Sequence, residues 1–309
     1  MASEKKATVK NDEASALDVV KFSAIEDAIE DIRLGRMVLV VDDDSRENEG
    51  DLVMAASRAT TERVNFMARC ARGLICAPID GEIARRLQLE PMTQKSSDKH
   101  GTAFLVSVDA REGTTTGISA EERAATARLL ADPNARPDDF YRQGHLFPLE
   151  ASPGGVLKRA GHTEAAVDLA RIAGLPPAGV ICEVMNDDGK MARLPDLVPF
   201  AARHGLRLIT VKDLIAWRSV REKLVEKIVE VNLPTKFGQF RAYAYRSTIE
   251  EDGRPPHIAL VKGDIANADA GTNGSGVLVR VHSECLTGDV FGSLRCDCGP
   301  QLHAALSMI

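Results

Sequence analysis

Two apolar patterns alternate along the first two-thirds of the chain, and this alternation constrains the fold more than any other feature. Apolar residues recur at helical spacing in one segment and form a short continuous run in the next, as in residues 25–34 and then 37–41. Later helix-type segments are 61–72, 120–130, 163–173, 195–204 and 212–217, and later strand-type runs are 74–77, 104–108, 180–184 and 206–210. The sequence therefore predicts an α/β fold with a mixed sheet flanked by helices.

Residues that begin or end helices support these boundaries. Ser119 with Glu122 three residues later is a capping box, which predicts a helix start at about Ala120. Gly35 and Gly174 stand where helices would end, and the segment 186–189 reads as a turn. Helices and strands therefore alternate throughout this part of the chain.

The pattern changes after residue 218. Residues 218–230 are charge-rich, with Leu224 and Ile228 at helical spacing, and later segments alternate like strands. These strand-like segments contain Phe240, Ala242 and Ala244, and then cover 258–261 and 277–281. We therefore predict a disordered tail (1–20), a first domain (21–218), a linker (219–233) and an incomplete, mainly β second domain (234–309).

Composition excludes several classes of function. The chain of 309 residues has a formal net charge of -6, which argues against a surface for nucleic acid or anionic membranes. The first 15 residues lack the apolar core of a signal peptide, and no later run approaches a membrane span, so we expect a cytoplasmic protein. Six cysteines, three of them within one short segment, suit reduced thiols and one metal site better than disulfides.

An acidic loop follows the strand-type run 37–41. Residues 42–51 (DDDSRENEGD) place six carboxylates around Arg46, and carboxylates this dense repel one another unless cations neutralise them. Magnesium prefers carboxylate oxygens and keeps water positions that substrate oxygens can take. The alternative interpretation is a solvated acidic turn.

A second cluster opens the helix-type segment 163–173. Arg159, Ala160, Gly161, His162 and Thr163 follow a glycine-rich stretch. Free backbone N–H groups at a helix start, a glycine and a nearby arginine favour phosphate binding, and a neutral imidazole can bind a metal. The alternative for His162 is an ordinary surface histidine.

Four short motifs together resemble the 3,4-dihydroxy-2-butanone 4-phosphate synthases. They are RENEGD (46–51), GHLFPL (144–149), RAGHTEA (159–165) and ICE (181–183), and the resemblance covers residues 25–217. It implies a carbon–carbon lyase of riboflavin biosynthesis that converts ribulose 5-phosphate to 3,4-dihydroxy-2-butanone 4-phosphate and formate. It also implies a homodimer in which both subunits contribute residues near each pocket.

The resemblance assigns roles to individual residues. Glu47 and His162 would hold magnesium or manganese, with two ions in each site. His145 and Glu183 match the pair essential for catalysis, and the order in which they transfer protons stays open. Substrate contacts would come from Arg46, Glu47, Asp51, Arg159, Ala160, Gly161, His162, Thr163 and Glu183.

Three further residues are candidates for the pocket. Glu49 and Cys76 match positions near the pocket of the family, although Cys76 also suits a small buried thiol. Thr115 could offer its hydroxyl to substrate or shape a turn before Gly117.

The proton chemistry explains why such groups are needed. A base must remove a carbon-bound proton beside the ketone to give an enediol, and cations at adjacent oxygens make that proton more acidic. In the family, dehydration, a carbon-skeleton shift and loss of C4 as formate follow.

A cysteine-rich segment near the end of the chain resembles the start of GTP cyclohydrolase II, in the words RVHSEC (280–285) and RCDCGPQL (295–302). By that likeness Cys285, Cys296 and Cys298 would bind zinc, and three thiolates with an open position suit a catalytic zinc. The residues facing GTP would be Arg280, Val281, His282, Ser283, Glu284 and Gln301. The alternative is three free cysteines in a poorly packed fragment.

The sequence stops at Ile309, within the helix expected after the cysteine pair, so we expect no GTP cyclohydrolase activity from this chain. Two alternatives remain. The chain could be a fragment of a bifunctional enzyme, which a longer reading frame would reveal. It could instead be a zinc- or nucleotide-sensing partner with an inactive first domain, against which the complete set of charged motif residues counts.

Overall fold

A computed structural model describes residues 22–249, 255–265 and 277–309. The chain divides into two units after Glu222. Val225–Thr235, most of which falls in the expected linker, is a strand of the second unit. The expected disordered tail, residues 1–20, lies outside the described residues.

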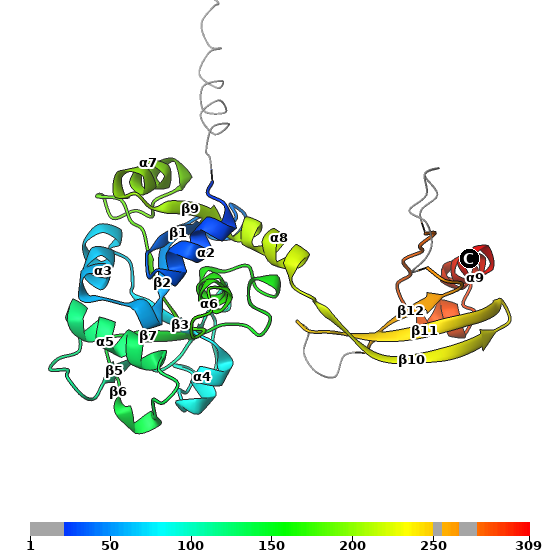
Figure 1. The fold of residues 1–309 in the computed structure, drawn as a ribbon, viewed down its shortest axis with the longest axis horizontal. Coiled ribbons are helices and arrows are strands. Elements are labelled where there is room, and N and C mark those ends of the chain that lie inside the picture. Colours follow the sequence, from blue (N-terminus) through cyan, green and yellow to red (C-terminus); the bar gives the residue numbers. More distant parts are fainter. Residues whose placement is uncertain (1–21, 250–254, 266–276) are drawn as a thin grey trace, which may run out of the picture. The chain divides into compact units, whose positions relative to one another are not determined.

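A seven-stranded mixed sheet forms the centre of the first unit, in the order β4-β7-β3-β8-β2-β1-β9 (Figure 1). β1 is parallel to β9 and β3 is parallel to β7, whereas the other neighbours are antiparallel. The predicted α/β class with a mixed sheet is therefore confirmed. The strands are β1 (Val38–Val41), β2 (Gly50–Ala55), β3 (Cys76–Ile79), β4 (Ala103–Phe104), β7 (Phe147–Glu150), β8 (Gly179–Glu183) and β9 (Arg207–Thr210), and a separate ribbon pairs β5 (Val108–Ala110) with β6 (Phe140–Arg142).

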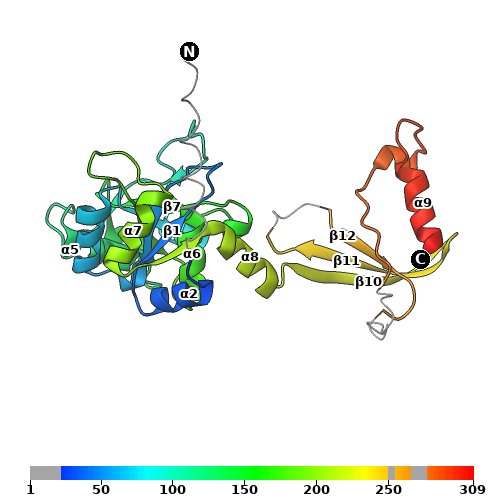
Figure 2. The ribbon, with the colours of Figure 1, turned by 90° about the horizontal axis from the view of Figure 1, so that it is seen from above.

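Helices cover both faces of this sheet. One face carries α2 (Ile25–Arg33), α6 (His162–Ile172) and α8 (Val211–Arg221), which lie together in Figure 2. The opposite core receives side chains from α3 (Thr61–Phe66), α4 (Gly81–Arg86), α5 (Ala120–Leu130) and α7 (Leu194–His204). Short helical turns are η1 (Ala56–Arg58), η2 (Met67–Ala71), η3 (Pro137–Asp139), η4 (Gly155–Leu157) and η5 (Leu286–Val290).

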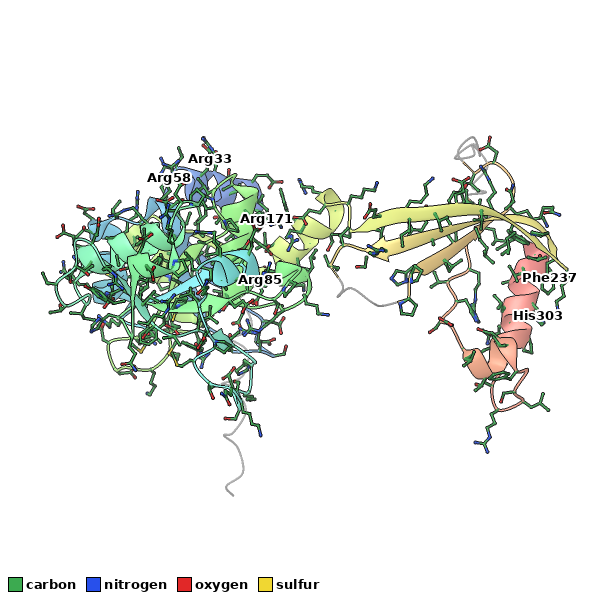
Figure 3. The ribbon with its side chains drawn as sticks, turned by 90° about the horizontal axis from the view of Figure 1, so that it is seen from below. Arg33, Arg58, Arg85, Arg171, Phe237 and His303 are labelled. Atoms are coloured by element: carbon green, nitrogen blue, oxygen red, sulfur yellow. The ribbon has the colours of Figure 1, made fainter. Side chains whose placement is uncertain are left out.

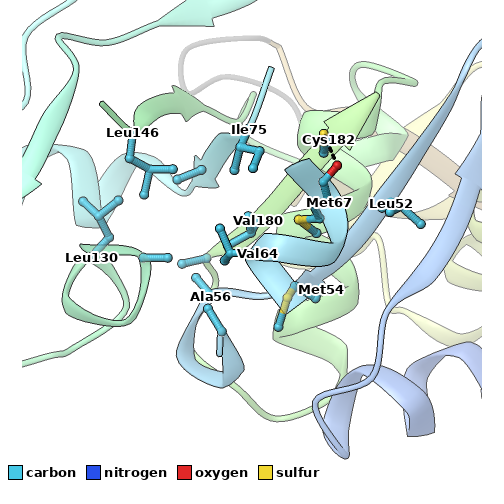
Figure 4. Close-up of a cluster of buried hydrophobic side chains, with 14 of the residues drawn as sticks. Leu52, Met54, Ala56, Val64, Met67, Ile75, Leu130, Leu146, Val180 and Cys182 are labelled. Atoms are coloured by element: carbon cyan, nitrogen blue, oxygen red, sulfur yellow. Dashed lines mark hydrogen bonds between the residues drawn. The ribbon is translucent and has the colours of Figure 1, made fainter. Parts of the chain in front are cut away.

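The central strands are buried on both faces, which explains their continuous apolar runs. In β1, Val38 and Val40 join the core beside α2 and α6, while Leu39 and Val41 join the opposite core. Figure 4 shows part of that opposite core, where Leu52 and Met54 of β2 lie near Val64 and Met67. Alternate side chains of β1 therefore pack against the helices on both faces of the sheet.

Two sequence predictions need correction in the first unit. The predicted strand 104–108 is wrong, because β4 ends at Phe104 and β5 begins at Val108. Between them, Leu105 donates its N–H to Pro148 O at 2.9 Å, whereas Val108 bonds to Leu146. The helix predicted over 61–72 is regular only to Phe66 and continues as the π-helical turn η2. The predicted capping box of α5 is present.

The second unit contains the antiparallel sheet β10-β11-β12, with β10 (Val225–Thr235), β11 (Gly238–Ser247) and β12 (His257–Val261). Phe240, Ala242 and Ala244 are buried on β11, which agrees with their predicted alternation. The helical spacing of residues 224–228 does not correspond to a helix, because this segment enters β10. The predicted strand 277–281 is wrong, because these residues form no strand. The ring of Phe237 lies 5.2 Å from that of His303 on α9 (Cys298–Met308) (Figure 3).

Candidate active site

One edge of the large sheet gathers three of the predicted site residues. Asp51 at the start of β2 lies directly opposite Glu183 at the end of β8. His145 precedes β7 by two residues, and β7 and β8 are the two neighbours of β3. Because β7 is parallel and β8 antiparallel to β3, the start of β7 and the end of β8 reach the same edge.

Gly73 lies directly against Glu183. Its N–H donates to the carbonyl of Glu183 at 3.1 Å. A Cβ added at Gly73 would lie 2.5 Å from the Glu183 Oε2 atom, so only glycine permits this approach. The chain before β3 therefore closes one side of the Glu183 carboxylate.

The acidic loop between β1 and β2 is wound around the carboxylate of Asp42. This carboxylate accepts the backbone N–H groups of Glu47 at 3.1 Å and Glu49 at 2.9 Å, and it pairs with Arg46 at 2.9 Å. Its side chain has no exposed surface. Asp42 therefore holds the loop in shape and leaves the Glu47 carboxylate to face α6.

Arg193 at the start of α7 fastens the same loop from outside. Its guanidinium donates to the carbonyl of Glu47 at 2.6 Å and to that of Asn48, whose φ of 54° is left-handed. Glu49 lies 3.7 Å from the same guanidinium. In this structure Glu49 thus contacts an arginine that fixes the loop.

His162 begins α6 beside these carboxylates. Its Nδ1 atom lies 3.7 Å from Glu47 Oε2 and 3.8 Å from Asp51 Oδ1, too far for hydrogen bonds. Ligand atoms of Asp42, Glu47 and His162 lie within 4.8 Å of one another. His162 is only 5% exposed, which excludes the surface-histidine alternative.

Several buried polar atoms at this edge lack hydrogen-bond partners among the described residues. They are Oδ1 of Asp51, Nε2 of His162 and Oε2 of Glu183. A buried polar atom without a partner is costly, so such atoms usually face a ligand, an ion or ordered water. The set of two carboxylate oxygens and one imidazole nitrogen fits a divalent cation and a polyhydroxy substrate.

Burial and mutual repulsion shift the protonation of this cluster. Burial raises the pKa of Asp51 to about 7 and also raises the pKa of Glu183. Interaction with His162 and with the Arg46 guanidinium lowers the pKa of Glu47 to about 2. Although burial opposes its charge, the carboxylates of Asp51 and Glu47 raise the pKa of His162 to about 9. A bound cation would replace the imidazolium as the positive charge here.

Two guanidinium groups flank the start of α6. Arg159 pairs with Glu164 at 2.6 Å and donates to Thr102 at 3.0 Å, which fixes its direction. A Cβ added at Gly161 would lie 2.6 Å from Arg159 Nη1 and 3.0 Å from Arg46 Nη2. The glycine therefore admits both arginines beside the free N–H groups of the helix start, where an anion is favoured.

His145 is held by Asp109, a residue that the sequence did not single out. The Asp109 carboxylate lies 2.8 Å from His145 Nδ1 and accepts the backbone N–H of His145 at 2.9 Å. Asp109 comes directly after the wrongly predicted strand 104–108. Because β5, which contains Asp109, was not predicted, no sequence pattern placed this residue beside His145. Arg193 lies 146 residues from Glu47 in sequence and stands in no local motif, so no sequence pattern predicts its contact with the loop.

The remaining pocket candidates have structural partners. Both the N–H and the hydroxyl of Thr115 donate to Glu122 of α5, the hydroxyl at 2.8 Å, which supports the turn-shaping alternative. Cys76 is 2% exposed, and burial raises the pKa of its thiol, which supports the small buried thiol.

The three cysteines of the second unit lie together. Ligand atoms of Cys285, Cys296 and Cys298 are within 4.8 Å of one another. A hydrogen bond with Thr287 lowers the pKa of Cys285 to about 7. A Cβ added at Gly288 would lie 2.8 Å from the sulfur of Cys296, so the turn η5 packs closely on the thiols.

The expected GTP-facing residues of the second unit lie in an irregular segment and on α9. Arg280 donates to Gln301 at 2.5 Å, and His282 Nε2 lies 2.9 Å from Asp289. Val281 is 86% exposed, and Ser283 and Glu284 continue the irregular segment.

Comparison with known proteins gives two family matches. The model of 3,4-dihydroxy-2-butanone 4-phosphate synthase matches residues 26–217, and that of GTP cyclohydrolase II matches residues 226–309. The riboflavin biosynthesis protein RibBA of Aquifex aeolicus is 57% identical over 291 residues, which cover 94% of this chain and 70% of that protein. The RibBA of Rhodococcus erythropolis is 58% identical over 293 residues, covering 94% and 68%.

Two solved structures are similar in fold. RibBX of A. baumannii, a two-domain 3,4-dihydroxy-2-butanone 4-phosphate synthase, matches with a TM-score of 0.75 and 44% identity, over 91% of this chain and 80% of that one. A 3,4-dihydroxy-2-butanone 4-phosphate synthase in complex with two magnesium ions matches with a TM-score of 0.63 and 46% identity, over 65% and 98%. Among the described residues no helix is long and apolar enough to cross a membrane.

Proposed function

The chain belongs to the 3,4-dihydroxy-2-butanone 4-phosphate synthase family and is a synthase of riboflavin biosynthesis, and we propose that its first unit converts ribulose 5-phosphate to 3,4-dihydroxy-2-butanone 4-phosphate and formate. The observation that carries this proposal is the set of unpartnered buried atoms on Asp51, His162 and Glu183 beside Glu47. These groups suit a substrate that combines a ketone, hydroxyls and a phosphate.

Glu47 and His162 would hold magnesium in this site, or manganese in its place. Both fit, because Glu47 is held ionised with a pKa of about 2 and the imidazole faces it at 3.7 Å. The similar synthase crystallised with two magnesium ions supports two ions in each site. When bound, such cations stabilise negative charge that develops on adjacent substrate oxygens.

The protein groups would divide binding from proton transfer. The phosphate would lie at the start of α6, where residues 159–163 and Arg46 supply N–H donors and positive charge. Asp51 would bind substrate hydroxyls. Glu183 and His145, at the same edge of the sheet, would move protons to and from carbon and oxygen. Burial raises the pKa of Glu183, which suits a carboxyl group that must accept and return a proton.

The experiment is to measure formate released from ribulose 5-phosphate by the purified chain, with magnesium and with EDTA. We expect formate only when the metal is present. Folded protein that releases no formate with magnesium or manganese present would contradict the proposal.

For the second unit we propose a zinc site at Cys285, Cys296 and Cys298, supported by the grouping of the three sulfurs. Metal analysis of the purified chain and of a Cys296→Ser variant would test it, and equal zinc contents would contradict it.

Homodimerisation stays a prediction that sedimentation can check. Formate release from GTP would likewise test the expected lack of GTP cyclohydrolase activity.

A further inference from the structure

The carboxylate of Asp109 makes two hydrogen bonds to one residue, His145. One oxygen accepts the backbone N–H at 2.9 Å, and the other lies 2.8 Å from the ring atom Nδ1. The Asp109 side chain is 8% exposed, whereas the His145 side chain is 44% exposed. The carboxylate thus lies behind the imidazole, and the ring reaches toward solvent.

Two glycines confine the Asp109 side chain. A Cβ added at Gly117 would overlap the Asp109 carboxylate, and one added at Gly144 would overlap the backbone between Val108 and Asp109. Only residues without side chains therefore allow the 114–119 loop and the segment before β7 to approach so closely. The Asp109 carboxylate therefore lies directly against Gly117, and the backbone of Asp109 lies directly against Gly144.

Glu122 in the first turn of α5 keeps this enclosure in place. Its carboxylate accepts the N–H groups of Gly117 at 3.1 Å and Ser119 at 3.3 Å, and it also accepts from Thr115. These hydrogen bonds lower the pKa of Glu122 to about 2, so the group stays ionised. The 114–119 loop is thus tied to a regular helix, and Gly117 stays against Asp109.

A carboxylate at Nδ1 determines where the imidazole carries its proton. A carboxylate only accepts hydrogen bonds, so a neutral imidazole beside it bears its proton on Nδ1 and keeps the lone pair on Nε2. A second partner of this kind also orients the ring, as carboxylates do for metal-bound and catalytic histidines in general. The exposed Nε2 side of the ring is then ready to accept a proton.

We propose that Asp109 is a positioning residue that sets the tautomer and direction of His145 for proton transfer through Nε2. This inference rests on the proposed function for the role of His145 in catalysis. The placement of the proton on Nδ1 stands apart from that role and can be measured by itself.

The first test is the rate of formate release by an Asp109→Asn variant. An amide can donate to Nδ1 and favour the wrong tautomer, so we expect kcat to fall by about 10²-fold or more, within the range for loss of acid–base catalysis. The KM for ribulose 5-phosphate and the magnesium affinity should stay unchanged. A kcat equal to that of the unsubstituted chain would overturn the proposal.

Ser107→Ala is the matched control. The Ser107 hydroxyl accepts the N–H of Gly144 at 3.1 Å, so its loss disturbs the same segment without touching the ring. We expect kcat to change little. An equal loss of kcat in both variants would mean that the segment responds to any disturbance and would overturn the specific role of Asp109.

The second test is ¹⁵N NMR of the unsubstituted chain, with His145→Ala used to assign the ring. A protonated Nδ1 and an unprotonated Nε2 in the neutral ring support the proposal, even if Asp109→Asn does not fold. The opposite tautomer overturns it. The activity of His145→Ala separates the two claims. If this variant releases formate at the full rate although the unsubstituted chain carries the proton on Nδ1, the proposed catalytic role of His145 fails, whereas its pairing with Asp109 stands.

Discussion

The described residues include two clusters of side chains that could hold a metal ion, and the clusters differ in how the fold holds them. In the first unit, Glu47, Asp51 and His162 lie among buried strands and a helix start, and His162 is 5% exposed. In the second unit, Cys285 directly precedes η5, Cys296 lies between η5 and α9, and Cys298 begins α9; all three are partly exposed. The first cluster is fixed by the fold around it, whereas the second depends mainly on residues close in sequence.

This difference affects what each cluster can do. A buried set of unpartnered polar atoms favours a ligand strongly, because each atom loses a hydrogen bond to water on burial. Partly exposed thiols remain in contact with water when no metal is bound. Zinc would therefore stabilise a site that the fold itself does not enclose. This contrast agrees with the lyase chemistry proposed for the first unit and with the separate zinc site proposed for the second.

The largest expected effect comes from Glu47→Ala. Loss of this carboxylate should reduce formate release by about 10²-fold or more, because a charged ligand of the proposed cations is removed. Asp44→Ala is the matched control on the same loop, since Asp44 is exposed. Formate assays across a magnesium titration would check both. Equal activities of Glu47→Ala and Asp44→Ala would mean that the Glu47 carboxylate contributes no more than a solvated carboxylate. That result would contradict its role as a metal ligand.

Next in size is the contrast in packing between the units. Leu39→Ala should lower the free energy of unfolding by about 2–5 kcal/mol, because Leu39 is fully buried in β1. Val231→Ala on β10, where the side chain is 49% exposed, should change it by less than about 0.5 kcal/mol. Trp217, the only tryptophan, reports unfolding of the first unit by fluorescence in urea. Circular dichroism at the same urea concentrations would follow both units.

A smaller effect should follow from loosening the acidic loop. Arg193→Ala removes the hydrogen bonds to the carbonyls of Glu47 and Asn48. Groups that orient a metal ligand typically contribute 10–100-fold to metal affinity, so we expect magnesium affinity to fall by about 10-fold. Calorimetry would measure it, with Arg33→Ala, an exposed arginine on α2, as the control. Unchanged affinity would show that Asp42 alone holds the loop.

The smallest effect concerns two ion pairs, one in each unit. Glu222 pairs with Arg218, whose side chain is 4% exposed, whereas Glu230 pairs with Lys227, which is 50% exposed. Glu222→Gln should lower the free energy of unfolding by about 1 kcal/mol at pH 7, and Glu230→Gln should have no measurable effect.

The Glu222 contribution should also depend on pH. Hydrogen bonding to Arg218 lowers the pKa of Glu222 below its usual value of 4.5. The contribution is therefore present above the unfolded pKa and is lost as pH falls through the folded one. Urea unfolding at pH 7 and at acidic pH would show the difference between Glu222→Gln and the unsubstituted chain shrinking. A constant difference would contradict this assignment.

Sequence patterns predicted most of the first unit because its elements are regular. Buried strands such as β1 and β8 carry unbroken apolar runs, and the capping box at Ser119 marks the start of α5. The predicted strand 104–108 is divided in the structure because β4 pairs with β7 whereas β5 pairs with β6, and a single run of apolar letters does not reveal this change of partner. Leu224 and Ile228 fit a helix by spacing, yet pairing with β11 draws the segment into a strand.

The candidate site was predictable where its residues stand in motifs. The words around Glu47, His162 and Glu183 identify the residues, and the sheet brings them to one edge. Asp109 and Arg193 contribute through contacts with residues distant in sequence, so they were found only once the fold was known.

The central claim is that the first unit alone carries the lyase chemistry. The most direct test measures formate release from ribulose 5-phosphate by two full-length variants, Glu183→Ala and the triple variant Cys285→Ser, Cys296→Ser and Cys298→Ser. We expect no formate from the first variant and a rate equal to that of the unsubstituted chain from the second. A folded triple variant that loses formate release, or a Glu183→Ala variant that retains it, would contradict the account.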